Sequence, residues 1–227
     1  MSDNVIEAAP KQQVLEGTVV GTAQSGLPTS PQLGLIENKD FQATAEMLAD
    51  AFVDKQGRCC CALVCSRSAS ITEQLKSFQQ TAQNYPEKLK RCAVVRDVDG
   101  SIIGYCALQS QGDPGNLAMP EFIRHKLSPG EVYLEQIGVS DKARGKGIGK
   151  QLMEWAEDMA RSLDAKYISL DVMAANRARS LYERQGYVIT PSPEGEGPCE
   201  LCISGCIIWC CMGCRYCRAY YMVKQLA

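Results

Sequence analysis

The hydrophobic pattern of the chain changes period several times after residue 32, and each change predicts an element. Runs of alternating or continuous β-forming residues predict strands over 33–37, 91–98, 101–109, 131–139, 165–172, 187–190 and 219–226. Apolar residues spaced three and four apart predict helices over 41–52, 70–84, 148–163 and 176–186. This order predicts an α+β domain, with a central mixed sheet of six to seven strands and helices on both faces.

Turn and cap signals refine that pattern. Asp99-Gly100 lies between two predicted strands and indicates a hairpin. The capping box Ser70-x-x-Glu73 predicts that the second helix begins at Ser70. The long connection over 112–129 holds the single histidine, His125, which we expect at the solvated surface because its neighbours in the chain are polar.

The remaining segments set the domain limits and the compartment. Residues 1–32 are rich in polar residues, glycine and proline and predict a flexible tail, so the domain is expected over 33–227 with a cysteine-rich insert at 191–218. The net charge of −2 argues against nucleic acid as a principal partner. The sequence shows neither a signal-peptide layout nor an apolar run of bilayer length, so we expect a cytoplasmic protein.

A predicted strand, a glycine turn and a predicted helix follow one another over 131–163, and together they favour an anion site. The turn has glycine at alternate positions between basic residues, in the order Arg144, Gly145, Lys146, Gly147, Ile148, Gly149, Lys150. A dinucleotide fingerprint would need glycine at position 150. A P-loop would need glycine at position 144 and serine or threonine at position 151, where the chain has Gln151. Both of these phosphate-binding motifs are therefore excluded.

The same turn resembles the pyrophosphate loop of the GNAT family of N-acetyltransferases, [RQ]-x-x-G-x-[GA], in the form Arg144-Gly-Lys-Gly147-Ile-Gly149. The segment 176–187 resembles the second signature of that family, N-x-x-A-x-x-L-Y-x-x-x-G-[FY]. Five of its positions match in register: Ala178, Leu181, Tyr182, Gly186 and Tyr187. Asn176 stands one residue later than the asparagine of the family. The resemblance implies the GNAT fold.

The resemblance also implies a cofactor and a reaction. Acetyl-CoA would be the co-substrate, with its pantetheine arm along the backbone of Ile137, Gly138 and Val139 and a further contact from Asn176. Its pyrophosphate would be held by the seven residues of the turn from Arg144 to Lys150. A primary amine would attack the thioester directly, and a backbone N–H near Val139 would stabilise the oxyanion.

The resemblance implies Tyr182 as the general acid that protonates the leaving thiolate. Packing of its ring on the sheet is the alternative. For the base we expect Glu135, because a carboxylate on a central strand is partly desolvated and its pKa is raised. A carboxylate bonded to a neighbouring group is the alternative there. Glu131, Glu121 and His125 are weaker candidates for the base.

Thirteen cysteines are unusual for this compartment, and most lie over 59–65 and 199–217. Three interpretations stay open: a zinc site built on the Cys-x-x-Cys pairs, S-acylated thiols at a membrane surface, and small apolar side chains in a core. We assign no metal ligand.

The sequence thus predicts an acetyl-CoA-dependent N-acetyltransferase. The alternative from a different class is a catalytically silent acyl-CoA-binding or membrane-associated adaptor. The sequence does not predict the amine acceptor or the oligomeric state.

Overall fold

A computed structural model describes residues 29–52, 67–119, 121, 124–173, 176–193 and 219–226, and in these ranges the predicted α+β layering is confirmed. The strands form one mixed sheet in the order β1-β2-β3-β4-β5-β7-β6. Their bounds are β1 Gln32–Leu35, β2 Cys92–Arg96, β3 Ile102–Gln109, β4 Glu131–Val139, β5 Tyr167–Met173, β6 Val188–Ile189 and β7 Ala219–Gln225. The helices are α1 Phe41–Phe52, α2 Arg67–Asn84, α3 Pro86–Leu89, α4 Ile148–Ser162 and α5 Arg179–Arg184.

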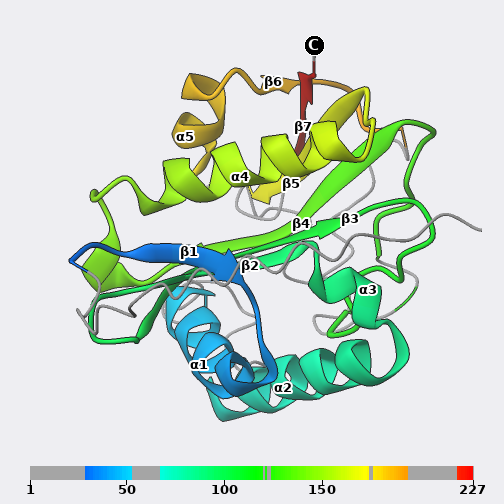
Figure 1. Ribbon diagram of the computed structural model, residues 1–227. Helices are drawn as coiled ribbons and strands as arrows, with labels where there is room; N and C mark the ends of the chain where they lie inside the picture. The colour runs from blue at the N-terminus through cyan, green and yellow to red at the C-terminus, as the bar shows by residue number, and fades with distance from the viewer. Residues whose placement is uncertain are drawn as a thin grey trace, which may run out of the picture.

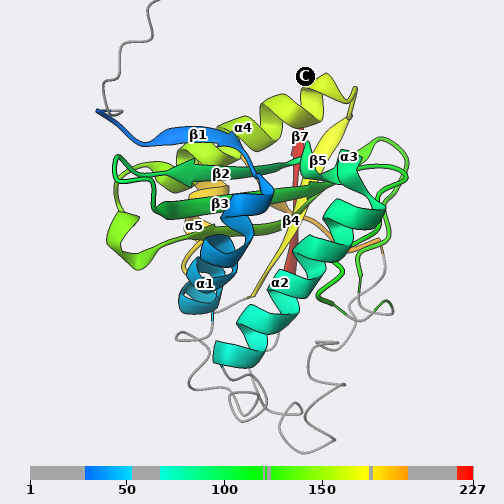
Figure 2. The ribbon, with the colours of Figure 1, turned by 60° about the horizontal axis from the view of Figure 1, so that its bottom comes forward.

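The helices lie in two layers (Figure 1), with α4 and α5 on one face of the sheet and α1 and α2 on the other. Figure 2, which is turned so that the face carrying α1 and α2 comes forward, shows these two helices crossing in front of the strands. Each layer of helices packs against the sheet and forms a hydrophobic core on its own face. Leu152 and Ala156 of α4 pack with Leu134 and Ile168, whereas residues of α1 and α2 pack with one another and with β2 and β3.

Strands β4 and β5 diverge in the middle of the sheet. Among the described strands β4 and β5 form the one parallel pair, and their register covers three positions that end at Tyr133↔Ser169. Both strands continue beyond that point, β4 to Val139 and β5 to Met173, without pairing with each other. We call the two diverging segments the V of β4 and β5 and the point after Tyr133 its apex.

A β-bulge in β4 lies just beyond the apex. Against β3, Ala107 pairs with Gln136 and Leu108 pairs with Leu134, so Glu135 is an extra residue. The bulge breaks the alternation of side chains. Glu135 and Gln136 both reach the α2–α3 side, where they contact Lys88 and Gln74 respectively.

Two details differ from the sequence prediction. The second helix begins at Arg67 rather than at Ser70, so the predicted capping box lies inside α2. Arg67 is fixed there by an ion pair with Asp50 of α1, and the Thr72 hydroxyl donates to the Ser68 carbonyl within the same turn. The second difference is α3, a four-residue helix with proline at its first position, which is too short to show a period.

The cysteine-rich segments at 59–65 and 199–217 and the tail over 1–28 lie outside the described residues. Cys92 and Cys106, which the structure does describe, are both buried and free. Within the described ranges there is no group of three or more His, Cys, Asp or Glu side chains placed to hold a metal ion. Of the helices described, none has the length and apolarity needed to cross a bilayer.

Candidate active site

The glycine turn before α4 has the backbone geometry that its sequence predicts. Gly145 and Gly147 have φ angles of 76° and 84°, a region that other residues adopt only under strain. A Cβ atom at either position would meet no atom within 4 Å, so both glycines face open space. Gly149 differs, because a Cβ there would lie 3.1 Å from Leu181 Cδ2. This third glycine lets α4 approach α5, and the first two leave backbone exposed.

The start of α4 offers unpaired donors beside positive charge. The first backbone hydrogen bond at this end runs from Gln151 N to Gly147 O at 3.0 Å, so the amides of the preceding helical residues point out of the helix. Lys146 and Lys150 are exposed beside them. Arg144 is paired with Asp141 and also donates to Val139 O at 3.4 Å. Donors, helix dipole and cations favour an anion at this point.

The end of β4 lies next to that turn. Ile137 and Val139 pack partly on the α4 core, whereas Gly138 faces α1, where a Cβ atom would come within 2.8 Å of Leu48 Cδ2. Because β4 has left β5 before these residues, the backbone edge that faces the V has no strand partner in the described structure. Such an edge can pair with an extended ligand in the way of an added strand.

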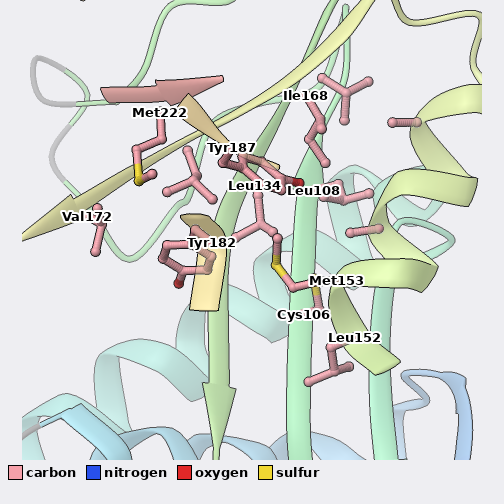
Figure 3. Packing of buried hydrophobic residues seen from close by; sticks show 14 of the residues in the cluster. Cys106, Leu108, Leu134, Leu152, Met153, Ile168, Val172, Tyr182, Tyr187 and Met222 are labelled. Atoms are coloured by element: carbon pink, nitrogen blue, oxygen red, sulfur yellow. The ribbon is translucent and has the colours of Figure 1, made fainter. Parts of the chain in front are cut away.

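Tyr182 of α5 belongs to the core on the α4 side of the sheet, with 5% of its surface exposed. Figure 3 shows its hydroxyl pointing away from Tyr187 and from the aliphatic side chains. No hydrogen bond joins that hydroxyl to another described residue. Burial, with a smaller contribution from nearby Cys106, raises the pKa of Tyr182, so its hydroxyl is protonated at neutral pH.

Asn176 is exposed at the start of α5. Its side-chain oxygen accepts the Ala178 N–H at 2.9 Å, and its carbonyl accepts the Arg179 N–H at 3.2 Å. The described contacts of Asn176 therefore cap the turn that leads into α5.

The comparison with known proteins assigns this architecture to a family. The sequence pattern of the Acetyltransferase (GNAT) family matches residues 62–187, which include the glycine turn, α4, the V and Tyr182. The chain is a member of the GNAT acetyltransferase family. The predicted family and fold are confirmed.

The matched relatives agree with this assignment. The uncharacterized N-acetyltransferase YycN of Bacillus subtilis is 38% identical over 58 residues, which are 25% of this chain and 37% of YycN. The match thus spans little more than a third of that relative. PaiA N-acetyltransferase from Thermoplasma acidophilum, solved in complex with coenzyme A, superposes with a TM-score of 0.54 at 13% identity and covers 86% of this chain and 99% of its own. YncA of Salmonella typhimurium, solved with its cofactor acetyl-CoA, gives 0.53 at 16% identity and covers 87% and 95%.

In this GNAT domain the bulge residue Glu135 lies in a closed ion pair. Its carboxylate oxygens lie 2.8 and 2.9 Å from Lys88 Nζ, and each side chain is 5% exposed. Lys88 also donates to the Pro114 carbonyl at 2.6 Å. Burial raises the pKa of Glu135, against the opposing effect of Lys88. The raised pKa was expected, but the lysine partner was not.

The expectation for His125 was wrong. Its side chain is 6% exposed, and its Nε2 lies 2.8 Å from Glu131 Oε1. Its ring stacks on Tyr133 with centroids 4.1 Å apart and lies 5.9 Å from the ring of Tyr221. The polar loop folds back over the sheet and carries the histidine inside. One signal was present in the sequence, since Glu131 and Tyr133 are polar side chains at alternate positions of a central strand and need partners on one face.

Proposed function

We propose that this GNAT domain transfers the acetyl group of acetyl-CoA to a primary amine. The observation that carries the proposal is the exposed turn with two positive-φ glycines and the open first turn of α4, directly beside the unpaired edge of β4. The turn suits a diphosphate and the edge suits an amide-containing arm, and acetyl-CoA has both. The complexes of PaiA with coenzyme A and of YncA with acetyl-CoA support this choice of cofactor.

The reaction then proceeds by direct transfer. The acceptor arrives as an ammonium ion and loses one proton, after which the nitrogen lone pair attacks the acetyl carbonyl carbon. The carbon–sulfur bond breaks, and its electron pair leaves on sulfur as a thiolate. The thiolate receives a proton from the acid, the new amide nitrogen loses its second proton, and one proton in total is released. The site residues bind acetyl-CoA, orient it and move these protons.

Tyr182 suits the acid, because its buried hydroxyl is protonated and forms no hydrogen bond with the other residues described. Glu135 is the base that the sequence predicts. Its raised pKa supports that role, whereas its pairing with Lys88 also gives it a structural one. The backbone of Ile137, Gly138 and Val139 would position the thioester.

Calorimetry with purified protein and coenzyme A tests the cofactor site. We expect Arg144→Glu to weaken binding by at least about tenfold, because it reverses a charge beside the diphosphate. Lys76→Glu is the matched control, since Lys76 is exposed on α2 on the other face of the sheet and its reversal changes the net charge equally. Absence of coenzyme A binding, or equal binding by the two variants, would contradict the proposed function.

Tyr182→Phe tests the chemistry. We expect kcat for acetyl transfer to fall by about a hundredfold while the dissociation constant of coenzyme A stays the same, because general acid catalysis contributes about 10²–10⁴. An unchanged kcat would remove Tyr182 from the mechanism. Coenzyme A binding without turnover of any amine would favour the silent acyl-CoA-binding adaptor.

A further inference from the structure

A tyrosine and a carboxylate meet at the apex of the V. Tyr133 is the last residue of β4 that pairs with β5, and Asp171 lies two residues beyond its partner Ser169. The Tyr133 hydroxyl donates to Asp171 Oδ2 at 3.1 Å. Leu134 and Ile168 turn toward α4, so by strand alternation Tyr133 and Asp171 lie on the opposite face. Of these two, Asp171 is exposed and Tyr133 is half-buried.

Tyr133 is held from behind by a cluster of buried polar side chains. We call this cluster, consisting of His125, Glu131, Ser169 and Tyr221, the polar hub. The stack of Tyr133 on the His125 ring has an interplanar angle of 17°, which leaves the tyrosine little freedom to tilt.

Glu131 fixes the hub. Its side chain is fully buried, and it interacts with His125 Nε2, the Ser128 N–H at 2.7 Å, the Tyr221 hydroxyl at 2.8 Å and the Ser169 hydroxyl. These partners come from the loop before β4, from β5 and from β7. Because the Glu131 carboxylate is held by hydrogen bonds from several segments, it fixes the position of the His125 ring. The stacked His125 ring in turn fixes the position of Tyr133.

We propose that Asp171 binds the ammonium group of the acceptor at the apex and takes its proton in place of Glu135, whose carboxylate is buried in the ion pair with Lys88. The positioning residues are Tyr133, His125 and Glu131. This inference rests on the proposed function and adds the acceptor side to it. The N–H bond of the ammonium breaks, its electron pair stays on nitrogen for the attack, and the proton passes to the Asp171 carboxylate. Because Asp171 is exposed, it returns that proton to water. The acceptor is therefore a cationic primary amine that approaches from the face of α1 and α2.

The main test is steady-state acetylation by the full chain with a defined amine panel. The panel contains a short peptide with a free N-terminus, an N-blocked peptide with one lysine, spermidine and tyramine. We expect Asp171→Asn to lower kcat/KM for the amine by about a hundredfold and to leave the KM of acetyl-CoA within about twofold. Asparagine keeps an acceptor for the Tyr133 hydroxyl and removes only the charge. Asp158→Asn, at an exposed aspartate on α4 outside the site, is the matched control and should behave as wild type.

The positioning residues need a readout that loss of structure alone would not produce. We expect His125→Ala to lower kcat for the amine by about tenfold without changing coenzyme A binding, and His125→Phe, which keeps the stacked ring, to restore most of the loss. Tyr133→Phe should raise the KM of the amine, and Tyr85→Phe on an exposed tyrosine is its control. We also expect the effects of His125→Ala and Asp171→Asn to be less than additive.

Two outcomes would overturn the inference while the proposed function stands. These are an Asp171→Asn variant with unchanged kcat/KM, and a His125→Phe variant no better than His125→Ala. Failure of coenzyme A binding would overturn the proposed function instead.

Discussion

The two glutamates of β4, Glu131 and Glu135, show how differently one strand can hold a buried carboxylate. They lie four residues apart, and their side chains are 0% and 5% exposed. At Glu131, burial raises the pKa, but the hydrogen bonds from His125, Ser169 and Ser128 outweigh it and leave the pKa at about 2. At Glu135, burial is the larger effect and the pKa is raised despite the ion pair with Lys88.

The difference follows from where each residue lies in the sheet. Glu131 lies where β4 pairs with β5, and side chains of β5, of β7 and of the loop before β4 bring several hydrogen-bond partners to it. Glu135 is the bulge residue beyond the apex, and its charge is balanced by the buried Lys88 of α3. One end of β4 is therefore a rigid support, and the other depends on a single partner. Substitutions at Lys88, Glu131 and Tyr221 each change one side of this contrast.

Removal of Lys88 should have the largest effect. Lys88→Met leaves the Glu135 carboxylate buried without a counter-charge, and breaking such a pair costs about 3–5 kcal/mol. Urea unfolding at neutral pH should show this loss in the free energy of unfolding.

The double variant Lys88→Met, Glu135→Leu supplies the control for that loss. With both charges gone we expect most of the stability to return, because an apolar pair of similar volume replaces the ion pair. If the double variant were less stable than Lys88→Met, the ion pair would itself stabilise the fold. It would then do more than let each charge compensate for the burial of the other.

At the other end of β4, Glu131→Gln should make the stability of the fold less sensitive to acid. The folded-state pKa of Glu131 is about 2 and its ordinary value is 4.5. The unfolded chain therefore takes up a proton first as the pH falls. The stabilisation is complete above about pH 4.5 and is lost progressively toward pH 2. A shift of this size corresponds to about 3 kcal/mol.

Unfolding free energies measured between pH 7 and pH 2 test this prediction. Wild type should lose the stabilisation across that acid window, and Glu131→Gln should be less stable at pH 7 with a flatter profile below pH 5. A variant that keeps the wild-type slope would show that other carboxylates govern the acid response.

Much of the fold could be predicted from local patterns. The turn from Arg144 to Lys150 needs glycines for a positive φ and an exposed backbone, and the positions of these glycines can be read directly from the sequence. Gly100, with a φ of 82°, closes the predicted hairpin for the same reason. Tyr182 could be located through the family signature, in which Gly186, with a φ of 89°, follows the end of α5.

The partners of buried charges could not be predicted in the same way. Lys88 and Glu135 are 47 residues apart, and Tyr221 and Glu131 are 90 apart. A single sequence carries no signal for such pairings, because they depend on which strands become neighbours and on a bulge that reverses the side-chain alternation. His125 was misplaced because its polar loop gave no indication that it folds over the sheet. The apex pair of Tyr133 and Asp171 was missed because it spans two strands.

Tyr221→Phe should have the smallest effect on the free energy of unfolding. It tests how much a buried tyrosine hydroxyl with a hydrogen-bond partner contributes, compared with one that has no described partner. The Tyr221 hydroxyl donates to Glu131, so we expect its removal to cost about 1.5–3 kcal/mol, the usual contribution of a hydrogen bond to a charged group. Tyr187→Phe is the matched control, because the Tyr187 hydroxyl is buried on the α4 side and has no hydrogen-bond partner among the described residues. Its removal should be neutral or slightly stabilising, since no bond is lost. Equal losses in the two variants would show that the hydrogen bond from Tyr221 to Glu131 adds no stability of its own.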